Sequence, residues 1–250
     1  MTSTKTALVT GAAKRLGRAI ALHLASVGWN VAIHYHGSAD EAESAADAVR
    51  ALGVKAATLK ANLSREEETI QLIGRAVAEL GPLTALVNSA SIFENDDWQS
   101  ASRASWDAHM ETNLRAPFVL SQAFARQVTG KGAIVNIVDQ RVLKPTPQFI
   151  SYSLSKAGLY WLTTTLSQAL GPNIRVNAIG PGPTMRNARQ SEEDFARQRD
   201  ATVLKRGAEP DDVAQAVRYL LEAEAVTGQM LAVDGGQHLI WQTPDVRVSE

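Results

Sequence analysis

With 250 residues, of which 45% are hydrophobic and 20% charged, the chain can bury the core of an α/β domain, and its composition excludes intrinsic disorder. Its 25 basic and 26 acidic residues give a net charge of −1 without a long run of one sign, so no nucleic-acid or membrane-surface function is expected. Cysteine is absent, which excludes disulfides and thiolate sites, and the apolar runs are too short for a secretion signal or a membrane span, so we expect a cytoplasmic protein.

Short apolar runs alternate with helical patterns along almost the whole chain. We predict buried strands at residues 6–10, 31–35, 56–59, 83–88, 133–138, 174–178 and 229–233. A helix predicted at 66–80 has apolar residues spaced three and four apart, at Ile70, Ile73, Val77 and Leu80. This alternation predicts an α/β single-domain Rossmann fold over residues 1–250, with a doubly wound parallel sheet of about seven strands. Such sheets bind ligands at the carboxyl ends of their strands.

Residues 183–205 interrupt this alternation. The segment is polar and has no apolar run long enough for another buried strand. It suits either a pair of surface helices or a mobile lid over the ligand site, and both interpretations stay open at this point.

The first predicted strand runs directly into Gly11-Ala12-Ala13-Lys14-Arg15-Leu16-Gly17, after which a helix begins. Gly11 suits the tight turn after the strand, and Gly17 lets the start of the helix pack close to it. The free amides of that helix start would then face a pyrophosphate. The loop predicts a dinucleotide cofactor, although glycines also end many strands that bind nothing.

The second predicted strand ends in His34-Tyr35-His36-Gly37-Ser38, a run without a carboxylate. An NAD enzyme usually has an acid here, which binds the ribose hydroxyl. His36 and Ser38, together with Lys14 and Arg15 of the glycine loop, instead suit the negative charge of a 2′-phosphate. The combination predicts NADPH as the cofactor, with an ordinary polar loop as the alternative.

Tyr152 and Lys156 lie four residues apart at the start of a helix predicted to run to about Leu170, so they share one helical face. A phenol with a pKa near ~10 is a weak acid at neutral pH, but a nearby ammonium stabilises its phenolate. The pair can supply a proton while a hydride arrives from a nicotinamide. Asp139, which follows the fifth predicted strand, strengthens this interpretation.

Five motifs occur in the order known from one family, namely Thr10-Gly11…Gly17, Asn88-Ser89-Ala90, Asn113, Tyr152-x-x-x-Lys156 and Pro181-Gly182. On these motifs, residues 5–236 resemble the short-chain dehydrogenases/reductases. The resemblance implies a catalytic set of Asn113, Tyr152 and Lys156, and often a homotetramer. The family's enoyl reductase branch has a wider Tyr–Lys gap, so the four-residue spacing here argues against that branch.

The same resemblance implies where the cofactor lies. Combined with the loop and strand-end residues, it predicts cofactor contacts at Gly11, Lys14, Arg15, Leu16, Gly17, His34, His36, Ser38, Asn62, Leu63, Asn88, Ala90, Lys156, Pro181, Gly182 and Thr184.

Three residues depart from most relatives: Arg15 and Ser91 replace glycines, and Asp139 replaces a serine. Reducing a ketone builds negative charge on oxygen, which a serine hydroxyl stabilises by donating a hydrogen bond, whereas a carboxylate only accepts. Reducing a C=N bond places a proton on nitrogen, so Asp139 favours an imine-type heterocycle. The alternative is a solvated Asp139, with Ser151 or Ser153 as the hydroxyl donor.

The three departures occur together in the pteridine reductases. The chain resembles that branch at Lys14-Arg15-Leu16-Gly17, His34-Tyr35-His36, Asn88-Ser89-Ala90-Ser91 and Val138-Asp139. The resemblance implies a pterin substrate bound by Arg15, Ser91, Phe93, Asp139 and Tyr152. Phe93 would stack on the pterin ring, although a loop aromatic often serves packing alone. Gly37 and Asn62 depart from that branch, where arginine and aspartate are usual, and the bacterial dihydromonapterin reductases share much of the pattern.

Two other functions stay open. One is a ketone reductase of the same family, acting on a 3-oxoacyl thioester or a sugar, against which Asp139 and Phe93 argue. The other is a cofactor-binding sensor without turnover, against which the complete catalytic set argues. The five histidines have no metal-ligand spacing, so no metal is expected. The paired acids at 96–97 are interpreted as a solvated turn, and Trp161 as packing or a subunit contact.

Overall fold

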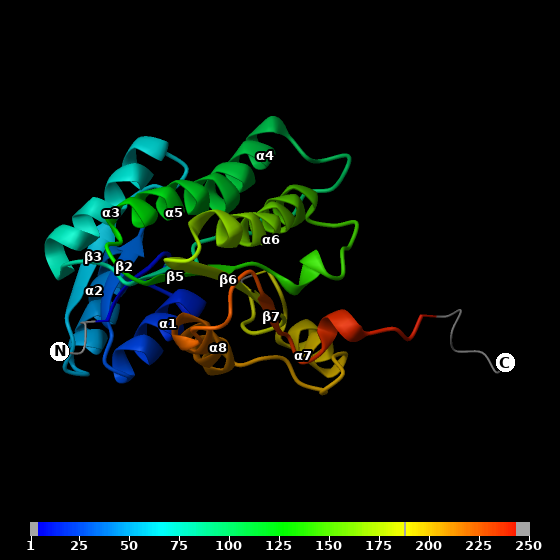
Figure 1. Ribbon diagram of the computed structural model, residues 1–250. Helices are drawn as coiled ribbons and strands as arrows, with labels where there is room; N and C mark the ends of the chain where they lie inside the picture. Colours follow the sequence, from blue (N-terminus) through cyan, green and yellow to red (C-terminus); the bar gives the residue numbers. More distant parts are fainter. Residues whose placement is uncertain (1–4, 188, 244–250) are drawn as a thin grey trace.

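A computed structural model of the chain describes residues 5–187 and 189–243. Its centre is a parallel sheet of seven strands in the order β3-β2-β1-β4-β5-β6-β7 (Figure 1). The strands are β1 (Thr6–Val9), β2 (Asn30–Tyr35), β3 (Ala56–Lys60), β4 (Ala85–Asn88), β5 (Gly132–Ile137), β6 (Ile174–Pro181) and β7 (Met230–Val233). The predicted fold class is therefore confirmed. Strand β6 runs on past the predicted end at residue 178, as far as Pro181.

Helices cover both faces of the sheet (Figure 1). They are α1 (Arg15–Ser26), α2 (Ala39–Arg50), α3 (Glu66–Leu80), α4 (Arg103–Met110), α5 (Ala116–Gln127), α6 (Ile150–Leu170), α7 (Glu192–Asp200) and α8 (Pro210–Glu222). Side chains of α1, α2 and α8 pack on one face, and side chains of α3, α5 and α6 pack on the other. The result is the three-layer arrangement expected for βαβ units.

The central strands are apolar on both sides because both faces of the sheet are covered. In β1, Ala7 and Val9 join the core beneath α1 and α8, whereas Leu8 joins the opposite core. All four residues of β1 and of β4 are buried. This explains why these strands appear in the sequence as uninterrupted apolar runs instead of alternating patterns.

Helix α3 has the predicted bounds, and Ile73, Val77 and Leu80 of its predicted apolar face pack on the core. Its buried residues are Thr69, Leu72, Ile73 and Ala76, whereas Ile70 is 48% exposed. The expectation that Ile70 faces the core is therefore wrong. Two overlapping apolar rows run along this helix, and the row that contains Leu72 and Ala76 meets the sheet and α5.

The strand order reverses beside β1, which lies between β2 and β4. Loops at such a reversal turn to opposite faces of the sheet and leave a crevice at the carboxyl ends of the strands. Here the loop after β1 and the segment after β4 approach closely, since a Cβ added at Gly11 would lie 2.9 Å from Cα of Ala90. The fold thus brings the two predicted cofactor loops together.

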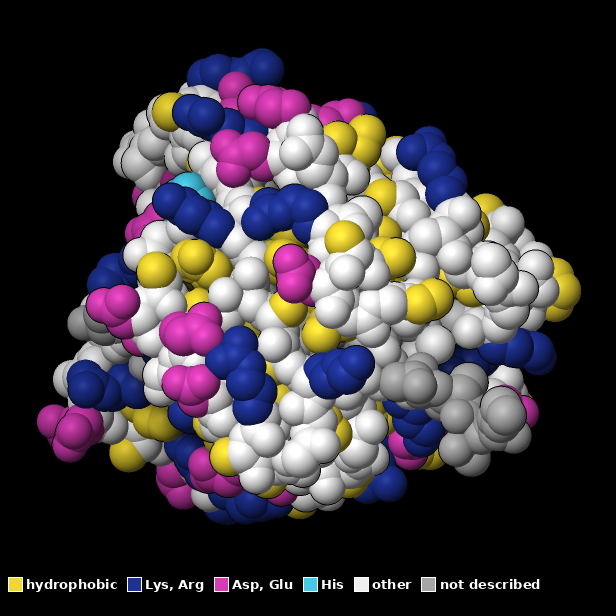
Figure 2. Space-filling model, turned by 90° about the vertical axis from the view of Figure 1, so that its left-hand side faces the viewer, with side chains coloured by type: hydrophobic (Ala, Val, Ile, Leu, Met, Phe, Trp, Pro, Cys, Tyr) yellow, Lys and Arg dark blue, Asp and Glu magenta, His cyan; other side chains and the backbone are white. Residues whose placement is uncertain are grey.

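The outer surface carries mixed charge. Figure 2 shows the side that bears α2 and α3, where basic and acidic side chains are interspersed. Within residues 5–187 and 189–243, no helix is long and apolar enough to span a membrane, and no group of three His, Asp or Glu residues is placed to hold a metal ion.

Candidate active site

A cavity of about 570 Å³ opens at the carboxyl ends of β5 and β6. The glycine loop, the segment after β4, the start of α6 and the segment after β6 form its walls. The predicted site residues that line it are Arg15, Leu16, Ser91, Phe93, Asp139, Tyr152, Lys156, Pro181, Gly182 and Thr184. The predicted substrate residues and the Tyr–Lys pair therefore meet in one pocket.

Asp139 and Tyr152 are in direct contact. The phenolic hydroxyl of Tyr152 donates to Oδ2 of Asp139 at 2.8 Å, and the backbone N–H of Arg141 donates to Oδ1 at 2.8 Å. Asp139 follows β5 and begins a short 3₁₀ turn, and Tyr152 is in the first turn of α6. Both oxygens of the carboxylate are thus held in place, so Asp139 is not a solvated loop residue.

Three perturbed pKa values occur at this contact. Burial raises the pKa of Asp139, although the hydrogen bonds from Arg141 and Tyr152 oppose the shift. Burial, followed by the charge of Asp139, raises the pKa of Tyr152 well above its ordinary value. Burial lowers the pKa of Lys156 to about 8, against the opposing effect of Asp139. Shifts of this kind gather at sites that move protons.

Lys156 does not act on the phenol as the sequence predicts. Its ammonium donates to the carbonyl of Ile137 at 2.9 Å and lies 5.8 Å from the centre of the Tyr152 ring. The pKa of Tyr152 is raised in this structure, so the expected stabilisation of a phenolate by Lys156 is wrong here. Desolvation and the neighbouring carboxylate of Asp139 raise the pKa of Tyr152, and the charge of Arg141 opposes them.

Asn113 is buried in a π-helical turn between α4 and α5, spanning Glu111–Arg115. Its side chain accepts from the N–H of Ile92 at 2.9 Å, and donates to the carbonyl of Ile92 and to Oγ of Ser155. It is not among the residues that line the pocket. Asn113 therefore ties the segment after β4 to α6, and it acts on the pocket through those elements.

The glycine loop has the close packing that the sequence predicts. Gly11 has φ of +65°, and a Cβ at Gly17 would lie 2.3 Å from the carbonyl oxygen of Gly11. Lys14, at the N-cap of α1, makes no side-chain cap hydrogen bond to the first turn. The amides there are left for another acceptor, which suits an anion.

His34 is a support for this loop and not a cofactor ligand. It is only 2% exposed, and burial lowers its pKa to about 4. Nδ1 accepts from the N–H of Gly11 at 3.0 Å, so the neutral ring donates from Nε2 to the carbonyl of Ala61 at 3.1 Å. Both ring nitrogens are occupied by backbone, so the predicted cofactor contact from His34 is wrong.

Of the residues expected near a 2′-phosphate, Lys14, Arg15 and His36 are exposed and Ser38 is partly buried. Ser38 precedes α2 without a side-chain cap bond to that helix. Lys14 Nζ lies 2.6 Å from Oε1 of Glu41, which is in the first turn of α2. The fold therefore brings a carboxylate to this region, although the strand end itself has none.

The other predicted cofactor residues differ in accessibility. Leu63 is buried in the core, and Asn62 closes its own turn by accepting from the N–H and hydroxyl of Ser64. Asn88 donates to Asn136, and its own buried Oδ1 lacks a partner among the described residues. The N–H of Ala90 donates to Thr10. Leu63 and Asn62 are thus mainly structural, whereas Asn88 retains an acceptor.

Aromatic rings form one wall of the pocket. Phe93 stacks on Phe149 with ring centres 4.4 Å apart and meets Tyr152 edge-on at 4.6 Å. The guanidinium of Arg141 lies over Phe149, and that of Arg189 lies over Phe93. Sequence reasoning missed Phe149, Arg141 and Arg189. The one available signal was that Phe149 stands directly before the helix of Tyr152.

Residues 183–187 and 189–205 lie over this wall and include helix α7, which has no buried residue. Arg15 donates to the carbonyls of Met185 and Arg186, and Arg189 donates to the carbonyl of Phe93 and pairs with Glu94. The segment therefore contacts the glycine loop on one side of the pocket and the segment after β4 on the other.

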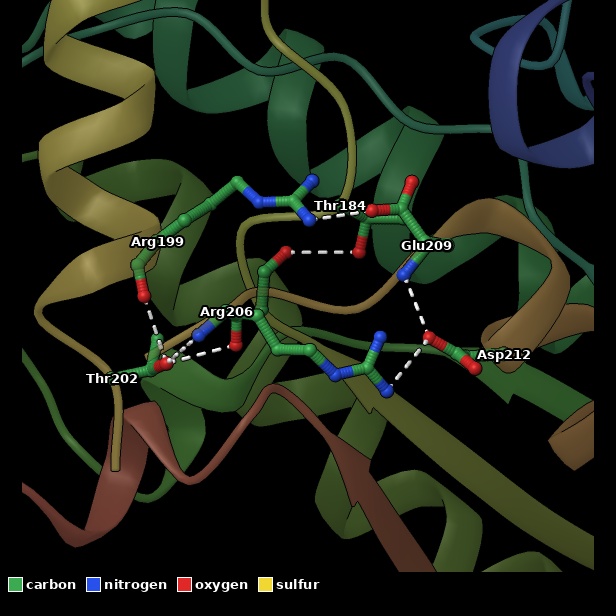
Figure 3. A network of polar contacts seen from close by, with 7 residues as sticks. Thr184, Arg199, Thr202, Arg206, Glu209 and Asp212 are labelled. Carbon is green, nitrogen blue, oxygen red and sulfur yellow. Dashed lines mark hydrogen bonds and ion pairs between the residues drawn. The ribbon is translucent and has the colours of Figure 1, made fainter. Parts of the chain in front are cut away.

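The two ends of this segment are close together and fixed. A Cβ at Gly207 would lie 2.0 Å from the carbonyl oxygen of Pro183, so the chain leaves and returns at one point. Beyond α7, Thr202 exchanges two hydrogen bonds with the backbone of Arg206, and Arg199 pairs with Glu209 near α8 (Figure 3). This geometry anchors the base of the segment and leaves its middle held by surface contacts.

Comparisons with known proteins agree with this geometry. Residues 11–238 match a family model described as enoyl-(acyl carrier protein) reductase. The FolM alternative dihydrofolate reductase 1 from Brucella suis, solved in complex with NADP, has a TM-score of 0.94 and 44% identity, with 98% of this chain and 99% of that chain covered. The angucycline C-6 ketoreductase LanV, solved with bound NADP, has a TM-score of 0.89 and 30% identity, with 94% and 96% covered.

Curated relatives are similar over the same length. The 3-oxoacyl-[acyl-carrier-protein] reductase FabG of Staphylococcus epidermidis is 34% identical over 242 residues, which cover 94% of this chain and 99% of that protein. The residues matched by the family model include the glycine loop and the Tyr152–Lys156 pair. The chain therefore belongs to the short-chain dehydrogenase/reductase family.

Proposed function

We propose that this protein is an NADPH-dependent reductase that adds a hydride and a proton across a C=N bond of a pterin-type substrate, such as a dihydropterin, dihydromonapterin or dihydrofolate. The observation that carries the proposal is the 2.8 Å hydrogen bond from Tyr152 to the carboxylate of Asp139 at the pocket wall. A ketone would develop negative charge beside this carboxylate, which is unfavourable. A ring nitrogen that gains a proton is compatible with it.

The residues around the glycine loop fit the proposed cofactor. The uncapped first turn of α1 and the close approach of Gly11 and Gly17 suit a pyrophosphate. The buried Oδ1 of Asn88, which has no partner among the described residues, offers an acceptor. Lys156 would bind the nicotinamide ribose, and Lys14 with His36 and Ser38 would bind the 2′-phosphate. NADPH, when bound, supplies the hydride.

Asp139 and Tyr152 would deliver the proton. Because burial raises the pKa of Asp139, its carboxyl holds a proton closer to neutral pH than an exposed aspartate does. Tyr152 stays protonated, since its pKa is raised as well. In the resting site Asp139 accepts from Tyr152 as a carboxylate. After Tyr152 has given its proton to the substrate nitrogen, Asp139 can take up a proton from solvent and pass it to Tyr152.

Phe93 would bind the substrate ring. A flat heterocycle stacks well on an aromatic face, and Ser91 and Arg15 supply polar groups at the same wall. One face of Phe93 is stacked by Phe149, and the guanidinium of Arg189 also lies over the Phe93 ring. A pterin that stacks on Phe93 would therefore replace one of these two contacts. We propose that residues 183–205 serve as the lid that permits this exchange.

The relatives support two substrate classes. The FolM neighbour is named an alternative dihydrofolate reductase, which supports the pterin proposal. FabG is named a 3-oxoacyl-[acyl-carrier-protein] reductase and LanV a C-6 ketoreductase, which makes a ketone the second candidate. Asp139 favours the first, because its carboxylate is already bonded to the proton donor Tyr152.

One assay separates these candidates. NADPH oxidation is followed by absorbance with dihydropterins, dihydrofolate, quinonoid dihydropterin and simple ketones, including a 3-oxoacyl thioester. We expect turnover with one or more of the pterins and little with the ketones. Efficient ketone reduction without pterin reduction would overturn the proposal, and tight NADPH binding without any turnover would favour a sensor.

The assembly and location are proposed from the family resemblance. We propose a cytoplasmic homotetramer, and Trp161 of α6, which is 71% exposed in the isolated protomer, suits a subunit contact. Light scattering of the purified protein tests the tetramer, and Trp161→Glu is expected to yield smaller assemblies.

A further inference from the structure

The catalytic helix α6 receives its N-terminal cap from a distant segment. Phe149 occupies the N-cap position with φ of +58° and makes no side-chain cap bond. Asp96 replaces that cap: its carbonyl accepts from the N–H of Ile150 at 3.2 Å, and its Oδ1 accepts from the N–H of Ser151 at 3.0 Å. The amides of a first helical turn need such acceptors, and a carboxylate there also interacts favourably with the helix dipole.

Hydrogen bonds continue from Asp96 through two more buried side chains. The hydroxyl of Ser151 donates to Oδ2 of Asp96, and Nδ1 of His109 lies 2.7 Å from that hydroxyl oxygen. The backbone N–H of Glu94 donates to Nε2 of His109 at 3.2 Å. Asp96, His109 and Ser151 are 3%, 1% and 0% exposed, so water does not compete for these bonds.

The direction of each bond is determined. The N–H of Glu94 can only donate, so Nε2 of His109 accepts and Nδ1 carries the proton of the neutral ring. Nδ1 then donates to Ser151, whose own hydrogen goes to the carboxylate of Asp96. Burial lowers the pKa of His109, in agreement with a neutral ring. The four groups form one directed chain from Glu94 through His109 and Ser151 to Asp96.

This chain contains Ser, His and Asp but is not a nucleophilic triad. In such a triad the serine donates to histidine, which donates to aspartate. Here Ser151 stands between the other two, donates to the carboxylate and is fully buried. A substrate cannot reach its oxygen, so the group has no nucleophile to offer.

Two members of the chain, Glu94 and Ser151, are sequence neighbours of residues of the proposed reaction. Glu94 follows Phe93, the proposed stacking residue, and Ser151 precedes Tyr152, the proposed proton donor. The ring of His109 also packs edge-on against Tyr152, with ring centres 6.0 Å apart. A displacement of the segment after β4 would therefore move the ring wall relative to the phenol.

We propose that Asp96, Ser151 and His109 are positioning residues that lock the Phe93 segment to the first turn of α6, so that the substrate ring and the Tyr152 hydroxyl meet in the correct geometry. The effect on substrate rests on the proposed function, whereas the lock itself does not. Two readouts are therefore needed, one without substrate.

Ser151→Ala is the test variant, and Ser153→Ala is its matched control. Ser153 lies two residues further along α6, and its buried Oγ has no hydrogen-bond partner among the described residues. Asp96→Asn is the second variant: its Oδ1 can still accept from Ser151 N–H. Its NH₂ would oppose the hydroxyls of Ser151 and Ser105, which both donate to Oδ2 of Asp96, and would reverse the chain at Ser151. Glu94 N–H would then meet an N–H of His109 instead of an acceptor.

Hydrogen exchange, measured by mass spectrometry on peptides covering residues 92–98, reports directly how firmly this segment is held to α6. We expect exchange roughly five- to tenfold faster in Ser151→Ala and Asp96→Asn, the factor expected for loss of one buried hydrogen bond, and unchanged exchange in Ser153→Ala. With a dihydropterin, KM should rise by a similar factor while the Kd of NADPH stays within about twofold of wild type.

The outcomes are distinguishable. Exchange and KM like those of Ser153→Ala would overturn the proposal, as would faster exchange with an unchanged KM. Loss of NADPH binding or of folding in both test variants would also overturn it, because the group would then have a general structural role. If the wild type reduces no pterin, the proposed function fails, and the exchange arm alone decides whether the lock exists.

Discussion

The hydroxyl of Tyr152 points at Oδ2 of Asp139 across 2.8 Å, and the other carboxylate oxygen is held by the backbone N–H of Arg141. The phenol therefore has a fixed orientation before any substrate is present. Since the raised pKa of Tyr152 keeps it protonated, it meets an incoming acceptor as a donor. A residue with this geometry suits proton transfer better than cofactor binding.

Tyr152→Phe should lower turnover by roughly 10²- to 10⁴-fold, the range for a lost general acid, while NADPH binding stays nearly intact. The reason is that the hydroxyl contacts Asp139 and the pocket, and the ring that packs on Phe93 is retained. Steady-state kinetics with fluorescence titration of NADPH measure both effects. Near-normal turnover in this variant would refute the assignment of Tyr152.

The lowered pKa of Lys156 predicts that NADPH binds more weakly in mildly alkaline solution. Its folded-state pKa is about 8, so the ammonium loses its charge as pH rises through that value. We expect the Kd of NADPH to increase from pH 7 to pH 9, and Lys156→Arg to remove this dependence because arginine stays charged. An identical pH profile in both proteins would contradict the prediction.

The lowered pKa of Lys156 affects stability in the opposite direction: NADPH affinity falls as pH rises, whereas the free energy of unfolding increases. The pKa of Lys156 is about 8 when folded and 10.5 ordinarily, so between these values the unfolded chain binds a proton that the folded chain does not. The contribution of Lys156 to the free energy of unfolding should therefore rise as pH goes from about 8 to about 10.5. Urea unfolding of wild type and Lys156→Met, compared across that range, measures it; equal slopes would contradict the sign.

Much of the fold could be predicted because its causes are local. Strands covered on both faces carry unbroken apolar runs, and the close contact of Gly17 with Gly11 tolerates no side chain. The Tyr152–Lys156 pair could also be found, since a spacing of four places both on one face of a helix. These features need no knowledge of distant contacts.

The remaining errors come from contacts between distant segments. Asp97 accepts from Gln99 and Ser100 within its own turn, as predicted for a solvated acid. Its neighbour Asp96 is instead buried and caps a helix that begins more than fifty residues later. Nothing local distinguishes the two acids, and the same holds for His34, whose burial depends on β3 and the glycine loop.

NADPH should be preferred over NADH, and Lys14 should carry part of that preference. Lys14 Nζ lies 2.6 Å from Glu41, and both side chains are half exposed, so a 2′-phosphate can compete for the ammonium. Lys14→Ala should weaken NADPH roughly tenfold, the scale of a lost charged hydrogen bond, with little effect on NADH. Glu41→Gln should tighten NADPH slightly, because it removes the competing carboxylate.

Binding constants for both cofactors in the three proteins provide the measurement. Comparable catalytic efficiency of the wild type with NADPH and NADH would contradict the predicted preference for NADPH. Equal weakening of both cofactors by Lys14→Ala would leave the preference in place but assign it to other residues near the end of β2.

Asp139→Ser separates the pterin proposal from the ketone alternative. For a C=N heterocycle, the change removes the acid–base partner of Tyr152. The rate of pterin reduction should therefore fall by roughly tens- to thousands-fold. It also introduces the hydroxyl donor that stabilises a developing alkoxide, so activity on activated ketones should appear or rise. The ratio of kcat/KM for a dihydropterin to that for a 3-oxoacyl thioester should therefore fall strongly.

Phe93→Ala is the companion variant, because it changes the ring wall and leaves the Asp139–Tyr152 contact in place. It should raise KM for a pterin through lost stacking while NADPH affinity is spared, whereas Asp139→Ser should act mainly on kcat. If the wild type reduces ketones well and pterins not at all, and Asp139→Ser changes neither activity, the carboxylate has only a structural role. In that case the buried hydrogen bond to Tyr152 orients the phenol without selecting between oxygen and nitrogen in the substrate.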